Sequence, residues 1–272
     1  MYMQTNYHPE RIGDMNGIKL LCPEPIARVI FCFLLVVNIF IFWKIVLPIK
    51  NRFCGKMIII LGIIGIIGGL LCAVADLLLD LKGPQNRKLG EVGIIDSEWE
   101  RMAHWRFVWS DIIAMLAVPM YSCGFIALMM ALYNEHPMMA TWLSVIFLIG
   151  AMGGFMIHTF LCLQPTIYGK ISEKAGQDLA VDVIQSVFRQ IYVPFFTLYS
   201  MLVIIPAMAV MGLIIGGLIQ APIWCVILNP VVFQLIGLIF RATKLDIFID
   251  APSCCAASLG LAAYGLLAVI CL

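Results

Sequence analysis

Charged residues are scarce in this 272-residue chain. Asp, Glu, Lys and Arg together make up 12% of it, against 62% for hydrophobic types, and the mean hydropathy is +1.01. A water-soluble domain of this length cannot cover its surface with so few charges. The composition therefore excludes a soluble globular protein and predicts a polytopic membrane protein. A net charge of +1, with basic residues scattered through loops, also argues against a nucleic-acid partner.

Histidine and catalytic motifs are also lacking. The four histidines, at positions 8, 104, 136 and 158, form neither an HxxxH nor an HExxH pattern, and there is no Walker A or GxSxG sequence. Most of the ten cysteines lie in apolar runs, where reduced thiols act as small packing groups, and no histidine stands near Cys254 and Cys255 in the sequence. We therefore expect no metal site and no cofactor.

Long apolar runs, in contrast, are abundant, and a run of about 20 residues is long enough to cross a bilayer as a helix. We predict an all-α transmembrane bundle forming one integral membrane domain over residues 1–272, after a polar segment at 1–26. The sixth of the seven spans is short and contains Asn229-Pro230, and the seventh begins in the small-residue run APSCCAAS, so six spans are the alternative. The predicted spans are residues 27–49, 57–81, 106–132, 138–163, 187–219, 222–241 and 251–272.

Two longer connections, at 82–105 and 164–186, are expected on the same side of the membrane, each with an interfacial helix. In the first, Ser97 and Glu100 have the spacing of a capping box. In the second, ISEKAGQDLAVDVIQSVFRQ reads as an amphipathic helix. Thirteen Lys and Arg residues fall on the N-terminal side of the predicted spans and four on the other. The positive-inside rule therefore predicts a cell-membrane protein with a cytoplasmic N-terminus.

The apolar stretch GIIGIIGGLLCAVADLLLD ends in two acids, Asp76 and Asp80. They continue, at helical spacing of three and four, a face made of small residues, and such faces are where membrane helices pack closely. In the fourth span, Gly150, Gly154 and His158 repeat this arrangement. We expect these titratable groups to point at other helices. Glycine-rich faces of this kind also allow copies of the chain to associate.

Alternating span directions bring the intramembrane polar residues to one level of the bilayer. Ionisable groups in a membrane are costly, and they usually pair with one another or line a wet cavity. We therefore predict one polar pocket that opens toward the two longer connections. Its residues fall at the ends of spans that meet on that side, and Gln234 of the sixth span approaches the same level: Asp76, Asp80, Ser110, Asp111, His158, Arg189, Gln190 and Gln234. Asn229 lies in the opposite, mostly apolar half, where Asn229-Pro230 can break the sixth span and shape the cavity.

Within this pocket, Asp76 and His158 are the candidate acid and base, with Asp111 orienting His158. We assign ligand binding to Asp80, Ser110, Arg189, Gln190, Asn229 and Gln234. Other readings stay open at this point. Asp80 could be a solvated helix end, His158 a packing histidine, and Arg189 a structural counter-ion of one aspartate.

Three functions of different classes fit this pattern. The first is a membrane-embedded enzyme or binding protein for an amphipathic, lipid-like molecule, with membrane lipids as its surroundings. The second is a small-solute or ion transporter, and the third a noncatalytic assembly or immunity-type protein. The layout of spans resembles uncharacterised bacterial multi-span integral membrane proteins, and this resemblance implies an architecture but no activity. The sequence alone therefore leaves open whether the chain is an enzyme.

Overall fold

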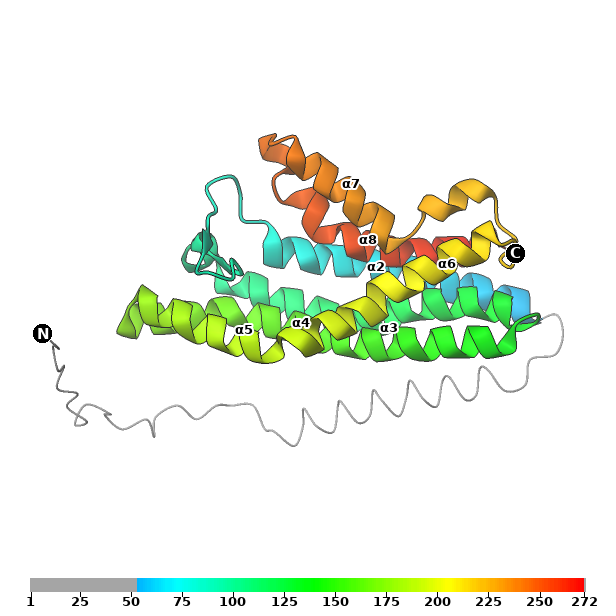
Figure 1. Ribbon diagram of the computed structural model, residues 1–272, viewed down its shortest axis with the longest axis horizontal. Helices are drawn as coiled ribbons and strands as arrows, with labels where there is room; N and C mark the ends of the chain where they lie inside the picture. The colour runs from blue at the N-terminus through cyan, green and yellow to red at the C-terminus, as the bar shows by residue number, and fades with distance from the viewer. Residues whose placement is uncertain (1–52, 272) are drawn as a thin grey trace, which may run out of the picture. The chain divides into compact units, whose positions relative to one another are not determined.

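The computed structural model describes residues 53–271, so the polar segment at 1–26 and the predicted span at 27–49 lie outside the described residues. The described part is all-α, apart from a two-stranded hairpin in which Lys88 pairs with Asp96 and Leu89 with Ile95 (Figure 1). The long elements are α2 (Phe53–Asp80), α3 (His104–Tyr133), α4 (Pro137–Ala175), α5 (Gln177–Tyr199), α6 (Ile205–Ile215), α7 (Pro230–Ala242) and α8 (Ala251–Ile270). The short ones are β1 (Lys88–Leu89), β2 (Ile95–Asp96), the 3-10 helices η3 (Ser97–Glu100), η5 (Ile223–Ile227) and η6 (Asp246–Phe248), and the π-helix η4 (Ser200–Ile204).

Five helices of the described part are long and apolar enough to cross a membrane, which supports a multi-pass membrane protein. They are Gly55–Asp80, His104–Tyr133, Pro137–Ala175, Gln177–Ile215 and Ser253–Ile270. The predicted number of seven spans is not supported. The predicted sixth span, 222–241, is wrong as a continuous helix, because it consists of η5, an extended residue at Asn229 and the 13-residue α7. At 1.5 Å per residue α7 is about 20 Å long, short of a bilayer core of about 30 Å.

The break before α7 follows from its sequence. Pro230 has no N–H to continue a helix from η5, and Asn229 caps the new helix by accepting hydrogen bonds from the backbone N–H groups of Val231 and Val232 at 3.0 and 3.1 Å. The Asn229 amide also donates to the carbonyl of Val226 at 2.6 Å. Asn229 therefore joins η5 to α7 where the helix is interrupted, and its side chain satisfies the backbone groups there. We call this junction the splice at Asn229.

The two longer connections differ from their expected form. Residues 164–175 are the end of α4 and residues 177–186 the start of α5, joined at Gly176, which has a φ of 95°. The expected capping box is absent at Ser97, whose hydroxyl instead accepts from the backbone N–H of Arg87 at 3.0 Å, and α3 begins only at His104. Because the Ser97 hydroxyl is hydrogen-bonded to the hairpin, it does not cap a helix, although its spacing to Glu100 favours this role.

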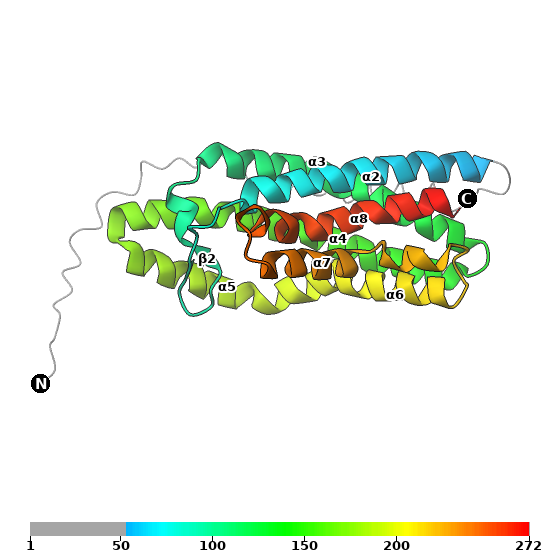
Figure 2. The ribbon, with the colours of Figure 1, turned by 90° about the horizontal axis from the view of Figure 1, so that it is seen from above.

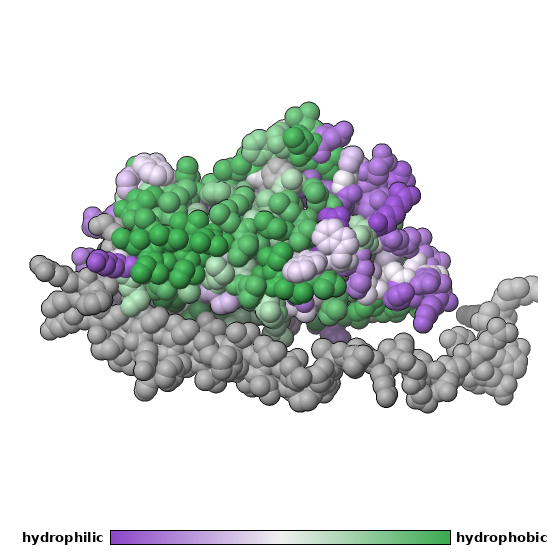
Figure 3. Space-filling view, turned by 180° about the vertical axis from the view of Figure 1, so that it is seen from behind, coloured by the Kyte–Doolittle hydropathy of each residue, from purple (hydrophilic) through white to green (hydrophobic). Residues whose placement is uncertain are grey.

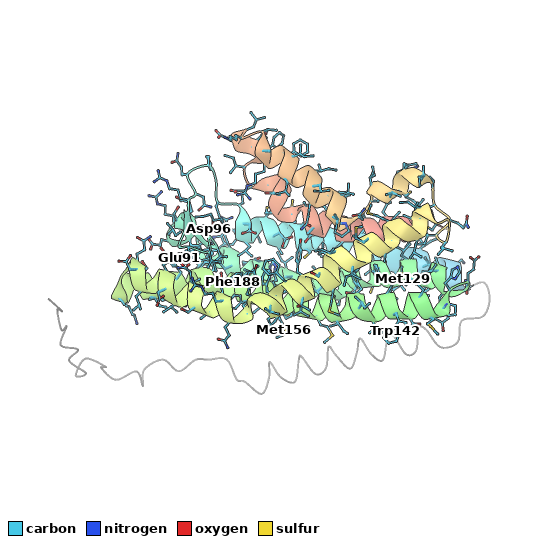
Figure 4. The ribbon with its side chains drawn as sticks, in the orientation of Figure 1. Glu91, Asp96, Met129, Trp142, Met156 and Phe188 are labelled. Atoms are coloured by element: carbon cyan, nitrogen blue, oxygen red, sulfur yellow. The ribbon has the colours of Figure 1, made fainter. Side chains whose placement is uncertain are left out.

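Hydrophilic side chains gather at one end of the bundle, and a broad hydrophobic surface covers much of the remaining length (Figure 3). Residues 81–103, Gly176 and the link between α7 and α8 meet at this end, which we call the polar end. Glu91, Asp96 and Phe188 lie there, whereas Trp142 and Met156 point outward from α4 farther along it (Figure 4). Which compartment the polar end faces stays a prediction.

Glycine sets the spacing between α2 and its neighbours α3 and α8, which lie beside it (Figure 2). A side chain at Gly65 would overlap the backbone of Gly124 in α3, and one at Gly69 would overlap the backbone of Ala262 in α8. Away from the polar end the interior is filled by aromatic rings, among them Phe125 stacked on Phe147 with ring centroids 4.1 Å apart. The described bundle is therefore tightly packed in that half.

Replacing Gly65 by alanine is expected to destabilise the bundle by about 1–3 kcal/mol, because the added methyl group collides with backbone that cannot rotate away. Gly212→Ala in α6 is the matched control, since a methyl group there meets nothing within 4 Å. The thermal unfolding midpoint of each variant in detergent tests this. Equal midpoints for the two variants would contradict the close α2–α3 contact.

Candidate functional site

Asp76 lies between three helices at the polar-end half of the bundle. One oxygen of its carboxyl group, Oδ2, accepts a hydrogen bond from the Ser258 hydroxyl of α8 at 2.5 Å. The other, Oδ1, faces Nδ1 of His158 in α4 at 3.6 Å. The side chains of Asp76 and His158 are 17% and 11% exposed. The structure thus brings the predicted acid and base together.

Ser110 of α3 orients the His158 ring. Its hydroxyl donates to the carbonyl of Ala75 at 2.7 Å and lies 2.9 Å from Nε2 of His158. A serine hydroxyl has one proton, so with that proton on Ala75 the oxygen must accept from Nε2–H. The thiol of Cys162 donates to the same oxygen at 3.5 Å. The hydroxyl of Ser110 therefore assigns the ring proton to Nε2 and leaves Nδ1 directed at Asp76.

This assignment determines what the pair can do chemically. Two states of the pair have no net charge: a protonated Asp76 beside a neutral His158, and a carboxylate beside an imidazolium with the proton on Nδ1. They differ by the position of one proton. Within the described residues, the titratable partner of Asp76 is His158, and no ion pair joins Asp76 to a lysine or arginine side chain. A membrane acid without a cation is typical of a proton-handling or binding site.

The other two predicted acids lie close by but have partners of their own. Asp111 accepts from the Thr159 hydroxyl at 2.7 Å, and although it is within Coulombic range of His158, Ser110 is the residue that touches the ring. Asp80 lies one helical turn beyond Asp76, is 40% exposed, and accepts from Nζ of Lys82 at 2.5 Å. Asp80 thus lies between the buried pair and the polar end.

The remaining predicted residues lie apart from Asp76 and His158. Arg189 pairs with Glu91 at 2.9 Å on the surface, where their side chains are 62% and 84% exposed, and Gln190 is exposed beside it. Gln234 donates to the hydroxyl of Tyr199. Asn229 is buried in the splice before α7. The structure therefore groups Asp76, Ser110 and His158, and it does not group Arg189 or Gln190 with them.

Sequence reasoning did not select Ser258 as a site residue, although its hydroxyl donates a hydrogen bond to the carboxyl group of Asp76. The available signal was the polar Ser258 within the small-residue start of the last span, at the depth expected for the pocket. A second residue missed was Lys82, which reads as an ordinary loop lysine in the sequence. Its neutralising role depends on the hairpin, which folds back over it.

A buried ionic cluster lies at the polar end beside this site. Asp96 is 1% exposed and contacts Nζ of Lys82 at 2.7 Å, Nζ of Lys88 at 2.8 Å and the amide of Asn86 at 2.6 Å. Burial alone would raise the pKa of Asp96, but the charge and hydrogen bonds of Lys82, with those of Lys88 and Asn86, lower it below its ordinary value. Burial would likewise lower the pKa of Lys82, whereas Asp80 and Asp96 raise it.

This end of α2 is also fixed through its backbone. The N–H groups of Lys82 and Gly83 donate to Oδ2 of Asp250 at 2.8 and 2.6 Å, which ties α2 to the start of α8. The Arg106 guanidinium of α3 donates to the carbonyl of Leu81 at 2.8 Å, a free carbonyl just past the helix end. These contacts fix the position of the last turns of α2 relative to α3 and α8, and with it the position of Asp76.

No three His, Cys, Asp or Glu side chains among residues 53–271 are placed to bind one metal ion together. The chemistry available in the described site is therefore that of carboxyl, imidazole, hydroxyl and thiol groups.

Asp96→Asn is expected to destabilise the fold by about 3 kcal/mol at neutral pH. This value is at the low end of the range for breaking a buried ion pair, because Asp80 still neutralises Lys82 in the variant. The pKa of Asp96 is lowered in the fold, so its stabilisation is present above the ordinary value near 3.9 and is lost as the pH falls below it. The unfolding midpoints of wild type and variant should therefore converge on acidification. Glu91→Gln, at the exposed pair with Arg189, is the control, and an equally large effect there would contradict the assignment.

Comparison with known proteins identifies a family and no activity. No curated protein and no solved structure matches the chain. A family model described as a family of unknown function (DUF6796) matches residues 49–272, a range that contains the whole described bundle. That description specifies no location, so the membrane assignment rests on the apolar helices. Because the match covers well over half of its length, the chain belongs to the DUF6796 family.

Proposed function

We propose that this multi-pass membrane protein binds an amphipathic, lipid-like molecule whose polar head reaches Asp76 and His158, and that the pair acts on this head as acid and base. The observation that supports the proposal is the Asp76–His158 pair, in which Ser110 orients the ring so that Nδ1 faces the carboxyl group of Asp76 at 3.6 Å. General acid–base catalysis needs such a positioned group with a mobile proton. A binding protein would use the same pair to donate and accept hydrogen bonds.

The depth of the pair favours a ligand from the bilayer. Asp76 lies four residues before the end of α2, about 6 Å along the helix axis. This is close to the level of lipid headgroups, so the head of a lipid-like molecule reaches the pair while its chain remains among the acyl tails. Asp80, one turn nearer the polar end, is 40% exposed and is hydrogen-bonded to Lys82.

The tight packing of the half away from the polar end argues against a transporter. A transporter normally has polar positions on both sides of a midplane site. In the described bundle, the half away from the polar end contains the stacked rings of Phe125 and Phe147 and the fully buried ring of Tyr264. The purely structural alternative predicts instead that the Asp76–His158 pair serves only helix packing, and the following experiment separates the two.

Asp76→Asn and His158→Gln are expected to keep the fold and to lose ligand binding by at least about tenfold, the effect of one charge-assisted hydrogen bond. Asparagine can still accept from Ser258, so the packing around position 76 is retained. The probe is a long-chain alcohol with a pyrene group at the chain end, presented in phosphatidylcholine vesicles. Energy transfer from the protein's tryptophans to pyrene measures its binding.

Asp178→Asn, an exposed acid in the first turn of α5, is the control for charge loss. Lipids retained by each purified variant, compared by mass spectrometry, provide a second readout that assumes no particular head group. Stable variants that bind and retain the same lipids as wild type would refute the proposal. Unfolded variants of both Asp76 and His158 would support the structural alternative.

A further inference from the structure

Two irregular stretches of backbone meet on one side of the Asp76–His158 pair. The π-helix η4 interrupts the long helix formed by α5 and α6, and the splice at Asn229 precedes the short α7. Turns of π-helix within α-helices occur often at functional sites. Tyr199, the last residue of α5, accepts a hydrogen bond from the Gln234 amide of α7. This contact joins the two irregular stretches.

The contact lies over the candidate site. A side chain at Gly150 of α4 would overlap the backbone of Met201 and Leu202, so η4 lies directly on the glycine stripe that leads to His158. A side chain at Gly154, one turn before His158, would meet the side chain of Leu202, one turn after Tyr199. Because α4 and α5 run in opposite directions, Tyr199 lies near the level of His158. A ligand chain that passes between α7 and η4 would therefore arrive beside Asp76 and His158.

Helix α7 packs along α8 but has little contact with η4. Its start is anchored by the Asn229 cap and by Pro230, which abuts Gly260 of α8. Toward the polar end, α7 diverges from α5 (Figure 1). Both flanking surfaces are apolar and open, with Val193 of α5 71% exposed and Ile239 of α7 67% exposed. Within the part of the chain that the structure describes, the Tyr199–Gln234 bond is the side-chain hydrogen bond joining α7 to another helix.

We infer that α7 is a lateral gate, closed by the Tyr199–Gln234 hydrogen bond, through which the hydrocarbon chain of the ligand passes from the bilayer to the Asp76–His158 site. This inference rests on the proposed function. Between membrane helices, polar side-chain contacts are weak enough to break thermally. Opening needs a small swing of α7 about Asn229, because the helix is already discontinuous there.

The test measures how fast the pyrene-labelled alcohol enters the purified protein from phosphatidylcholine vesicles. Tyr199→Phe and Gln234→Leu should each speed uptake by about threefold to tenfold, the range for loss of one interhelical hydrogen bond, and the double variant should be no faster than either single one. The amount bound at equilibrium should not change. Tyr192→Phe, an exposed tyrosine two turns earlier on α5, is the matched control and should leave the rate unchanged.

A second variant, Tyr199→His with Gln234→His, allows the gate to be locked by Zn²⁺, which should slow uptake until the metal is removed by a chelator. If neither loss of the Tyr199–Gln234 hydrogen bond nor Zn²⁺ binding changes the uptake rate, while Asp76-dependent binding is intact, the gate is refuted and the proposed function is not. If the probe shows no Asp76-dependent binding to any form of the protein, the proposed function and the gate fail together.

Discussion

The close approach of α2 to α3 and α8 is the contact on which the candidate site depends. Only glycine at positions such as 65 and 69 lets these backbones touch, because any side chain would overlap the neighbouring helix. At this spacing the carboxyl group of Asp76 reaches Ser258, and the carbonyl of Ala75 reaches Ser110. A wider gap would leave a membrane-buried acid without partners, which is costly in a medium without water. Packing and hydrogen bonding therefore require each other here.

The site also depends on charge being neutralised at two levels. In the bundle, the carboxyl group of Asp76 faces Nδ1 of His158, so a single proton on either group leaves the pair without net charge. At the polar end, Asp96 and Lys82 are buried as ions and are stabilised by each other and by Asp80. The outer cluster fixes the end of α2. A buried ion pair of this second kind gives specificity of arrangement more than net stability.

Regular helices form the packed half of the bundle, and the irregular backbone lies beside the site. The π-helix η4 packs against α4 at Gly150, and the splice at Asn229 packs against α8 at Gly260. Non-helical backbone at membrane depth is tolerated where its polar groups are satisfied, and the Asn229 side chain provides this before α7.

Composition and periodicity predicted an all-α membrane bundle and its five long described helices, although the predicted spans 138–163 and 187–219 leave out the last turns of α4 and the first turns of α5. Nδ1 of His158 and Oδ1 of Asp76 lie 3.6 Å apart, whereas Arg189, expected beside them, pairs with Glu91. Hydrophobic runs are set by the bilayer thickness, and glycine spacing determines which face of a helix packs. The break in the predicted span 222–241 and the partners of Arg189, Lys82 and Ser258 were decided only by the tertiary structure. Which side chains meet depends on helix rotation and on how the hairpin folds back, and neither leaves a periodic signal in the sequence. The sequence determined that polar groups must be buried together, and the packing of the helices determined which of them form hydrogen bonds and ion pairs with one another.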